Sequence, residues 1–255
     1  MTARILIVAG SDSGGGAGIQ ADIKTVTMLG GHAMTAITAI TAQNTLGVQA
    51  ARTLPADFVL EQMASCIEDI GLDAVKTGML GSADIVRHVS GGLLAARGQA
   101  GPVPLVVDPV MVATSGSVLA DPQTIAAMRA RLFPLASVVT PNLPELEALG
   151  GVDEILAHAP AVLVKGGHAD GDTVIDRLVT REGEVARWAD SRIETTSTHG
   201  TGCTLASAIA TGLGQGLDLA AAIDRARRFV RAALLAAPGL GGGHGPMGHQ
   251  AVREF

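Results

Sequence analysis

The sequence is poor in aromatic and charged residues. Of its 255 residues, 2% are aromatic, none is tyrosine and 16% are charged, whereas 47% are apolar. So apolar a chain is not expected to be disordered, and its core must be built from aliphatic side chains. The scarcity of aromatic residues leaves little for stacking single-stranded bases, and a net charge of −6 argues against a basic surface for duplexes. We therefore expect no nucleic-acid partner.

Cysteine and long apolar runs are also scarce. The two cysteines, Cys66 and Cys203, predict reduced thiols rather than a disulfide framework. No run approaches the roughly 20 apolar residues that cross a membrane, and the apolar run over 5–9 is too short for a secretion signal. We expect a soluble, cytoplasmic protein with no membrane partner.

Apolar strand-like segments alternate with helix-like segments along the whole chain. Strands are expected over 4–9, 33–42, 73–76, 103–107, 137–140 and 161–165, and helices over 17–29, 56–70, 82–97, 122–131, 144–150, 201–212 and 217–235. Two further strands, 173–179 and 183–188, flank a turn and predict a hairpin. This order predicts an α/β fold in a single domain over 1–255, with a mostly parallel sheet, helices on both faces and an antiparallel edge hairpin.

Polar or flexible residues follow each predicted buried strand. They lie at 10–12, 43–44, 78–79, 108–109, 142 and 165–167. Ligands of open α/β sheets bind beyond the carboxyl ends of the strands. The pattern therefore predicts one shared cleft.

The segment over 198–203, Thr-His-Gly-Thr-Gly-Cys, opens a predicted helix. Gly200, Thr201 and Gly202 would leave the first backbone N–H groups free to face an anion, aided by the helix dipole. Such a turn stabilises the charge that develops during phosphoryl transfer. Cys203 in the first turn is expected to have a pKa below the usual value of about 8.5. A plain helix start with a buried thiol is the alternative.

The glycine-rich stretch over 10–22 lies at a predicted strand-to-helix turn. It matches neither the P-loop nor the dinucleotide fingerprint, because no Gly-Lys-Ser/Thr follows and the glycine spacing differs. Its glycines would let the backbone approach a ligand closely. A mobile loop with ordinary capping is an equally good interpretation.

Asp108, Asn142, Glu145 and Lys165 follow neighbouring predicted strands. An Asp, an Asn and a Glu around one turn suit Mg²⁺ held largely through water. Asn142 and Glu145 also have the spacing of a helix capping box, and both roles can hold together. Lysine is rarely buried without a partner, so Lys165 is a candidate for a nucleotide phosphate or for a structural ion pair.

As a set, these segments resemble the ribokinase-like superfamily and, within it, the hydroxymethylpyrimidine/phosphomethylpyrimidine kinases. The matching stretches cover nearly the whole chain in the family's order: AGSDSGGGAGIQADIKT (9–25), TAITAQNTLGV (38–48), KTGML (76–80), VVDPVM (106–111), TPNLPE (140–145), VKGGH (164–168), STHGTGCTLASAIA (197–210) and GLGGGHGPMGH (239–249). Each stretch alone is a weak signal, whereas the set is specific.

The resemblance implies a three-layer αβα sandwich without the lid of the sugar kinases. It implies ATP-dependent phosphorylation of 4-amino-5-hydroxymethyl-2-methylpyrimidine to the monophosphate and then to the diphosphate, in thiamine diphosphate biosynthesis. ATP and Mg²⁺ are the implied ligands, K⁺ is a further candidate, and a homodimer is expected. The residues carried over are Gly10, Asp22, Gln43, Met79 and Val107 for the pyrimidine, Asp108, Asn142 and Lys165 for the nucleotide, Asp108 and Glu145 for the metal through water, and Gly200, Thr201, Gly202 and Cys203 for catalysis.

Two other functions stay open at this point. Cys203 stands where the sugar kinases carry a general-base Asp, and some pyridoxal kinases share this Cys, so a pyridoxal or pyridoxine kinase is the first alternative. The thiol would act as a thiolate base or complete the anion hole. The second alternative, an inactive vitamin- or nucleotide-sensing module, is disfavoured because Asp108, Glu145, Lys165 and the Gly-Thr-Gly-Cys turn are all present.

Overall fold

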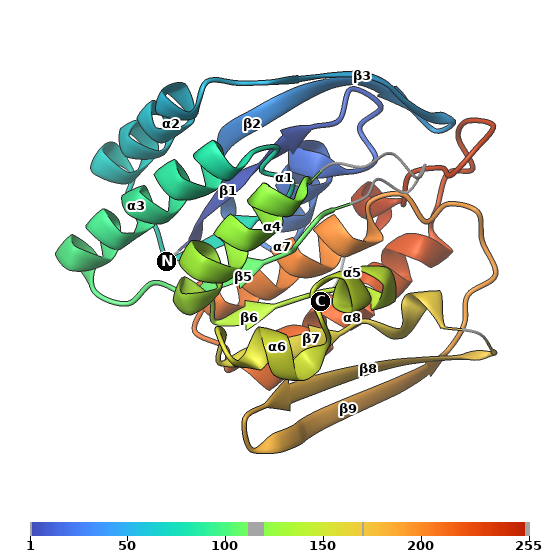
Figure 1. The fold of residues 1–255 in the computed structure, drawn as a ribbon. Coiled ribbons are helices and arrows are strands. Elements are labelled where there is room, and N and C mark those ends of the chain that lie inside the picture. The colour runs from blue at the N-terminus through green and yellow to red at the C-terminus, as the bar shows by residue number, and fades with distance from the viewer. Residues whose placement is uncertain (1, 112–119, 170, 253–255) are drawn as a thin grey trace.

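The computed structural model describes residues 2–111, 120–169 and 171–252, which form helical layers around one central sheet (Figure 1). The sheet has nine strands in the order β3-β2-β1-β4-β5-β6-β7-β8-β9. Their bounds are β1 Arg4–Ser11, β2 His32–Asn44, β3 Gly47–Thr53, β4 Ala74–Thr77, β5 Leu105–Val107, β6 Val138–Val139, β7 Ala161–Val164, β8 Thr173–Thr180 and β9 Gly183–Ser191. Within the described residues every strand belongs to this sheet, so no separate lid sheet is present there.

The six central strands are parallel and both edges of the sheet are antiparallel. The β8–β9 hairpin was expected from the sequence and extends β7. Strand β3, which pairs antiparallel with β2 at the other edge, was not expected. Its sequence, GVQAART, is largely exposed and lacks an apolar face that would have marked it as a strand.

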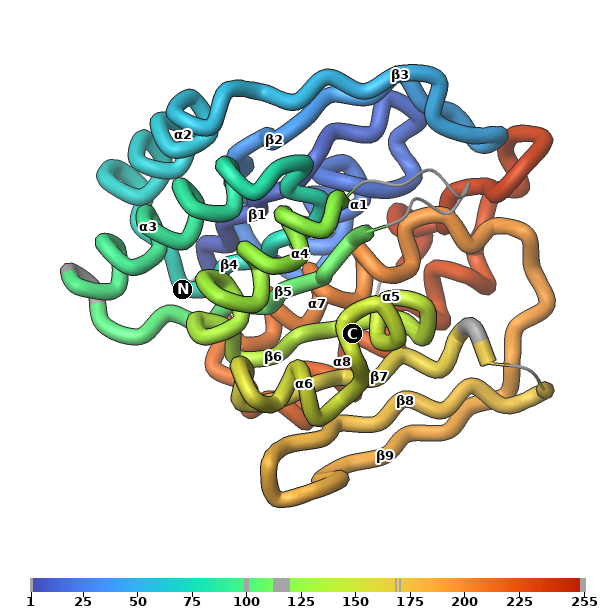
Figure 2. The backbone as a smooth tube through the Cα atoms, viewed as in Figure 1, coloured from blue at the N-terminus to red at the C-terminus, as the bar shows by residue number. Residues whose placement is uncertain are grey.

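Helices cover both faces of the sheet. Figure 2 shows α2, α3 and α4 along one face. This face carries α2 Ala56–Asp69, α3 Ala83–Ala100, α4 Pro122–Ala127, α5 Leu143–Ala148 and α6 Val152–Leu156, and the opposite face carries α1 Gly18–Met28, α7 Thr201–Gly214 and α8 Leu219–Leu235. Every helix in the described part of the chain is too short or too polar to span a membrane.

Alternate side chains of the central strands belong to two separate hydrophobic cores, one on each face of the sheet. In β1, Leu6 and Val8 pack under α2 and α3, whereas Ile5 and Ile7 pack under α1, α7 and α8. Successive side chains of a strand point to opposite faces, so a strand buried on both faces is mostly apolar on both. The aliphatic composition of the chain follows from this arrangement.

The expected helix over 122–131 differs in detail from the structure. Helix α4 ends at Ala127, and the chain continues as a π-helical turn, Met128–Leu132, and a 3₁₀ turn, Phe133–Leu135. Pro134 lacks an N–H group, so a regular helix cannot run through it. The short helix α6 was not expected, and the strand predicted over 137–140 is reduced to β6.

Candidate active site

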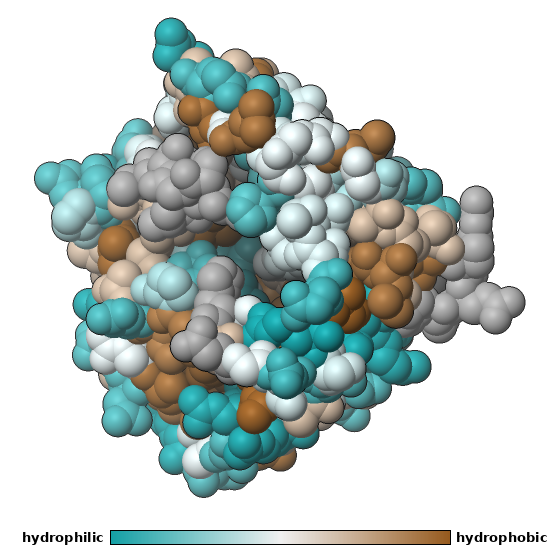
Figure 3. Space-filling model, turned by 90° about the vertical axis from the view of Figure 1, so that its right-hand side faces the viewer, coloured by the Kyte–Doolittle hydropathy of each residue, from teal (hydrophilic) through white to brown (hydrophobic). Residues whose placement is uncertain are grey.

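A cavity of about 790 Å³ lies beyond the carboxyl ends of the parallel strands. Figure 3 views the molecule from this side, where the surface is hollowed toward its centre. The volume is in the range of small-molecule sites. Most of the predicted site residues line the cavity: Gly10, Gln43, Met79, Asp108, Asn142, Glu145, Lys165, Gly200, Thr201, Gly202 and Cys203. The structure therefore brings the scattered segments together in one cleft, as the sequence predicted.

The turn before α7 has the geometry of an anion site. Gly200, the N-cap of this helix, adopts a left-handed conformation with φ of 83°. A Cβ atom there would lie 1.9 Å from the carbonyl oxygen of Gly16, so only glycine fits. The first N–H groups of any helix have no partner within it. Here Thr201, Gly202 and Cys203 form that first turn and line the cavity. The Thr201 N–H donates to the Thr198 carbonyl at 3.4 Å, so the N–H groups of Gly202 and Cys203 are the ones available to an anion.

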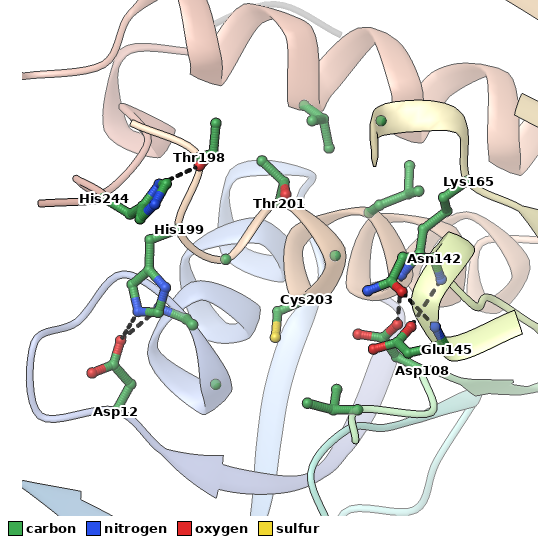
Figure 4. A pocket seen from close by; sticks show the side chains of 18 of the residues that line it. Asp12, Asp108, Asn142, Glu145, Lys165, Thr198, His199, Thr201, Cys203 and His244 are labelled. Atoms are coloured by element: carbon green, nitrogen blue, oxygen red, sulfur yellow. Dashed lines mark hydrogen bonds and ion pairs between the residues drawn. The ribbon is translucent and has the colours of Figure 1, made fainter. Parts of the chain in front are cut away.

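The Cys203 side chain lies between the two polar ends of the cavity (Figure 4). Burial raises the pKa of its thiol to about 11; the ammonium group of Lys76 opposes this rise, and the carboxylates of Asp22 and Asp108 add to it. The predicted lowering of this pKa was therefore wrong. The sequence reasoning counted the helix end alone, but desolvation and two nearby carboxylates outweigh it. At neutral pH the group is a thiol, which disfavours the role of a thiolate base.

One end of the cavity holds a buried lysine–aspartate pair. Lys165 Nζ donates to Asp108 Oδ1 at 2.9 Å, and the Thr140 hydroxyl donates to the same oxygen at 3.1 Å. Burial works to lower the pKa of Lys165, but Asp108 and Glu145 raise it above its usual value. A Cβ on Gly202 would lie 3.2 Å from Lys165 Nζ, so this ammonium group stands beside the first turn of α7. The lysine is therefore charged and placed where an anion at that turn would meet it.

Asn142 and Glu145 form the predicted capping box at the start of α5. Each accepts a 2.8 Å hydrogen bond from the backbone N–H of the other. Burial raises the pKa of Glu145 to about 7; Lys165 opposes this rise and Asp108 adds to it. Glu145 therefore caps the helix and also presents a desolvated carboxyl group to the cavity.

The carboxyl groups fit a water-shelled divalent cation. Asp108 and Glu145 line the same cavity, and Asp108 adds to the rise in the pKa of Glu145, which a nearby cation would relieve. Within the described residues, no three His, Cys, Asp or Glu side chains gather as a metal cage. A site with two carboxylates and water as ligands suits Mg²⁺, which keeps several of its waters.

At the other end of the cavity, Asp12 organises the glycine-rich loop. Its carboxylate accepts from the backbone N–H groups of Gly14, Gly16 and Ala17 at 2.8, 3.0 and 2.8 Å. His199 Nε2 lies 2.9 Å from the same carboxylate (Figure 4). The loop is therefore a closely capped turn tied to the anion site. Residues 10–12 were predicted to lie at the cleft and His199 in the anion turn, but neither Asp12 nor His199 was given a role of its own from the sequence.

Burial alone would raise the pKa of Asp12, but hydrogen bonds outweigh it. The bonds from His199 and from the N–H groups of Ala17 and Gly14 hold the pKa of this carboxyl group below its usual value. Asp12 is therefore ionised at neutral pH and acts as an acceptor only.

Two predicted pyrimidine contacts do not lie in the cavity. Asp22 is fully buried beneath it, where its oxygens accept from Lys76 Nζ at 2.8 and 3.0 Å and from Ser207 at 2.7 Å. Val107 is also fully buried, in the core under α2 and α3. Both residues were predicted to bind the pyrimidine, and neither lines the cavity. Asp22 is the partner of a buried lysine, and Val107 ends a strand that is covered on both faces.

The cavity has a further wall that the sequence reasoning missed. It is formed by β8, the chain after β9, and α8, and includes Val174, Ile193, Val230 and Leu234. In a sequence, the i, i+4 spacing of Val230 and Leu234 is also that of an ordinary core-facing helix. This wall lies on the Lys165 side of the cavity and offers an apolar surface for a flat ring.

Comparisons with known proteins agree with this arrangement. Residues 12–248 match the family model described as phosphomethylpyrimidine kinase. A hydroxymethylpyrimidine/phosphomethylpyrimidine kinase of Streptomyces coelicolor is 47% identical, over 96% of this chain and 93% of that protein. A thiamine biosynthesis bifunctional protein of Geobacter sulfurreducens is 46% identical over 98% of this chain, which spans about half (53%) of that protein's length.

Solved structures share the same ribokinase-like fold. A pyridoxal kinase of Bacillus subtilis, solved as an ADP complex, has a TM-score of 0.88 and 33% identity over 99% of each chain. A phosphomethylpyrimidine kinase of Clostridium difficile has a TM-score of 0.77 and 37% identity, over 91% of this chain and 99% of that chain. The expected three-layer α/β architecture is thus confirmed.

Proposed function

Because this chain belongs to the phosphomethylpyrimidine kinase family, we propose that it phosphorylates 4-amino-5-hydroxymethyl-2-methylpyrimidine at the expense of ATP. It then phosphorylates the monophosphate to the diphosphate, a step toward thiamine diphosphate. The chain is a phosphotransferase, as its kinase family requires. Residues 1–255 act as one kinase domain in this proposal.

The observation that carries the proposal is the division of one cavity into two ends. The Gln43 carboxamide lies at the end that holds His199 and Asp12, and Gly10 and Met79, which contact one another, also line the cavity. An amide offers both a donor and an acceptor, which suits the edge of an aminopyrimidine. The other end holds the ion pair of Lys165 and Asp108. The anion turn of α7 opens between them, where a phosphoryl group would pass from nucleotide to ring.

The reaction needs positioning more than covalent chemistry from the protein. The hydroxymethyl oxygen attacks the terminal phosphorus of ATP, the bond from that phosphorus to the ADP oxygen breaks, and the hydroxyl proton is released. Charge on the transferred oxygens is stabilised by the backbone N–H groups of the turn Gly200–Cys203. Lys165 and Asn142 hold the nucleotide phosphates. The second phosphorylation needs no base, because the acceptor phosphate is already ionised near neutral pH.

Asp108 and Glu145 would hold Mg²⁺ through water, as part of the same proposal. When bound, this ion supplies positive charge to the phosphate oxygens of the nucleotide. K⁺ is a second cation to test. A homodimer and a cytoplasmic location complete the proposal, and light scattering of the purified chain measures the first.

A pyridoxal kinase is the second candidate, favoured by the likeness to the Bacillus subtilis structure. The two functions share the anion turn and differ at the ring end of the cavity. We expect kcat/KM to be higher for the hydroxymethylpyrimidine than for pyridoxal when both are assayed side by side with ATP and Mg²⁺. The Gln43→Ala variant should raise KM for the pyrimidine and leave KM for ATP unchanged. A higher kcat/KM for pyridoxal would transfer the assignment to the second candidate.

A further inference from the structure

His199 joins the two glycine-rich segments that close one end of the cavity. The residue is nearly buried, with 8% of its surface exposed, and its ring packs against Gly16. A Cβ atom added to Gly16 would lie only 2.5 Å from Cδ2 of the ring. Its Nε2 atom lies 2.9 Å from Asp12 Oδ2 and 3.2 Å from Gln43 Nε2. One ring nitrogen therefore faces both the carboxylate that caps the loop and the carboxamide proposed to read the substrate.

The contact with Asp12 decides which ring nitrogen of His199 carries a proton. The Asp12 carboxylate is ionised and already accepts three backbone N–H groups, so it can only accept from His199. A lone pair on Nε2 would repel it at 2.9 Å. Nε2 therefore carries hydrogen whether the ring is neutral or charged.

A protonated Nε2 in turn constrains the carboxamide of Gln43. With its nitrogen toward His199, two N–H donors face each other across 3.2 Å. At the other end, Thr41 Oγ1 lies 3.2 Å from Gln43 Oε1, but the single hydroxyl proton of Thr41 has a better acceptor in the Ser11 carbonyl at 3.0 Å. A turn of the carboxamide by 180° relieves both contacts. Its oxygen then shares the single Nε2–H of His199 with Asp12 Oδ2 in a three-centre hydrogen bond, and its nitrogen donates to Thr41 Oγ1.

We propose that His199 is a positioning residue that sets the substrate specificity of the site by fixing the Gln43 carboxamide with its oxygen toward His199. This inference rests on the proposed function. One lone pair of the oxygen and one N–H of the nitrogen remain for the ligand, in a fixed order along the cavity wall. A ring that presents an amino group beside a ring nitrogen pairs with both at once. Without His199 the carboxamide turns freely, and the site loses its preference for that edge.

The test compares two substrates that differ only in this edge: 4-amino-5-hydroxymethyl-2-methylpyrimidine and the analogue that lacks the 4-amino group. The wild-type chain should prefer the amino compound in kcat/KM. We expect His199→Ala to reduce this preference by at least about tenfold, because a site built to pair with a polar group discriminates strongly against its absence. Gln43→Ala should reduce it as much, and the double variant should reduce it no further.

Two variants separate positioning from general damage to the fold. His199→Gln places an amide N–H where Nε2–H stood, so it should restore at least part of the preference. His88→Ala removes a solvent-accessible histidine on α3, far from His199 in the sequence. This control variant should leave the preference unchanged. Thermal unfolding of each variant shows whether it is folded.

The outcomes distinguish the inference from the function on which it rests. A preference retained in folded His199→Ala, or a loss in the double variant equal to the product of the two single losses, would overturn the inference and leave the proposed function standing. A wild-type chain that turns over neither pyrimidine would overturn both. Loss of preference in His199→Ala, its recovery in His199→Gln and no further loss in the double variant would support the inference.

Discussion

The buried pair of Lys76 and Asp22 offers a test of how this fold carries charge beneath its cavity. Both side chains have no exposed surface, and Lys76 Nζ lies 2.8 and 3.0 Å from the two carboxylate oxygens of Asp22. Ser207 donates to the same carboxylate at 2.7 Å. Burial works to lower the pKa of Lys76, but the carboxylate of Asp22 raises it above its usual value. Burial raises the pKa of Asp22, and the Lys76 ammonium group and the Ser207 hydroxyl oppose that rise. Each charge of the pair therefore depends on the other.

Removing either partner should be costly, because the remaining charge cannot reach water. We expect Lys76→Met and Asp22→Asn each to lower the free energy of unfolding by about 3–5 kcal/mol. The double variant leaves no buried charge and keeps an acceptor for Ser207. It should therefore be more stable than Lys76→Met alone, by about 1–3 kcal/mol.

Urea unfolding of the four chains, followed by circular dichroism, measures this coupling. The exposed ion pair of Arg87 and Asp84 provides the matched control, and Arg87→Met should change stability by less than about 1 kcal/mol. Additive losses in the double variant would mean that the two buried charges do not depend on one another, contrary to this expectation. An Asp22→Asn variant with unchanged stability and a raised KM for the pyrimidine would also contradict this expectation, because it would show that Asp22 binds the pyrimidine ring.

Three further predictions concern other parts of the cavity and its supports. Burial lowers the pKa of His249 from 6.5 to about 4, and Lys24 adds to this, so the unfolded chain takes up a proton before the folded chain does as pH falls. Stability is therefore lost as pH falls from about 6.5 through 4, by about 3 kcal/mol in all, and His249→Gln should flatten this slope in urea titrations at pH 7 and pH 4.5. Gly200→Ala, which would place Cβ against the Gly16 carbonyl, should reduce kcat by at least about tenfold in the kinase assay, and an unchanged kcat would contradict the anion-turn geometry. Because the pKa of the Cys203 thiol is raised to about 11, Cys203→Ser should lower kcat by less than about tenfold, and a loss of about a hundredfold or more would reinstate the thiolate base.

Local spacing in the sequence was enough to predict the structure of a segment whose contacts lie within that segment. Asn142 and Glu145 are three residues apart, and the capping box they form needs no other part of the chain. The order of strands and helices predicted the sheet, because most side chains of the central strands are apolar on both faces. The exposed strand β3 has no such pattern and was missed.

Side-chain environments that depend on distant segments could not be predicted. Asp22 and Lys76 are 54 residues apart, so nothing local shows that they neutralise each other beneath the cavity. The pKa of Cys203 depends on Lys76 of β4, Asp22 of α1 and Asp108, which follows β5. Asp12 and His199 are 187 residues apart, and their contact became visible only when the two glycine-rich segments were folded together.

A time course of the purified chain with ATP, Mg²⁺ and 4-amino-5-hydroxymethyl-2-methylpyrimidine, with products resolved by mass, tests whether the chain carries out both phosphorylations. We predict that the monophosphate appears first and that the diphosphate follows as the monophosphate is consumed. A parallel reaction with pyridoxal serves as the comparison. Phosphorylation of pyridoxal alone, or no phosphorylated product from the pyrimidine, would contradict the account.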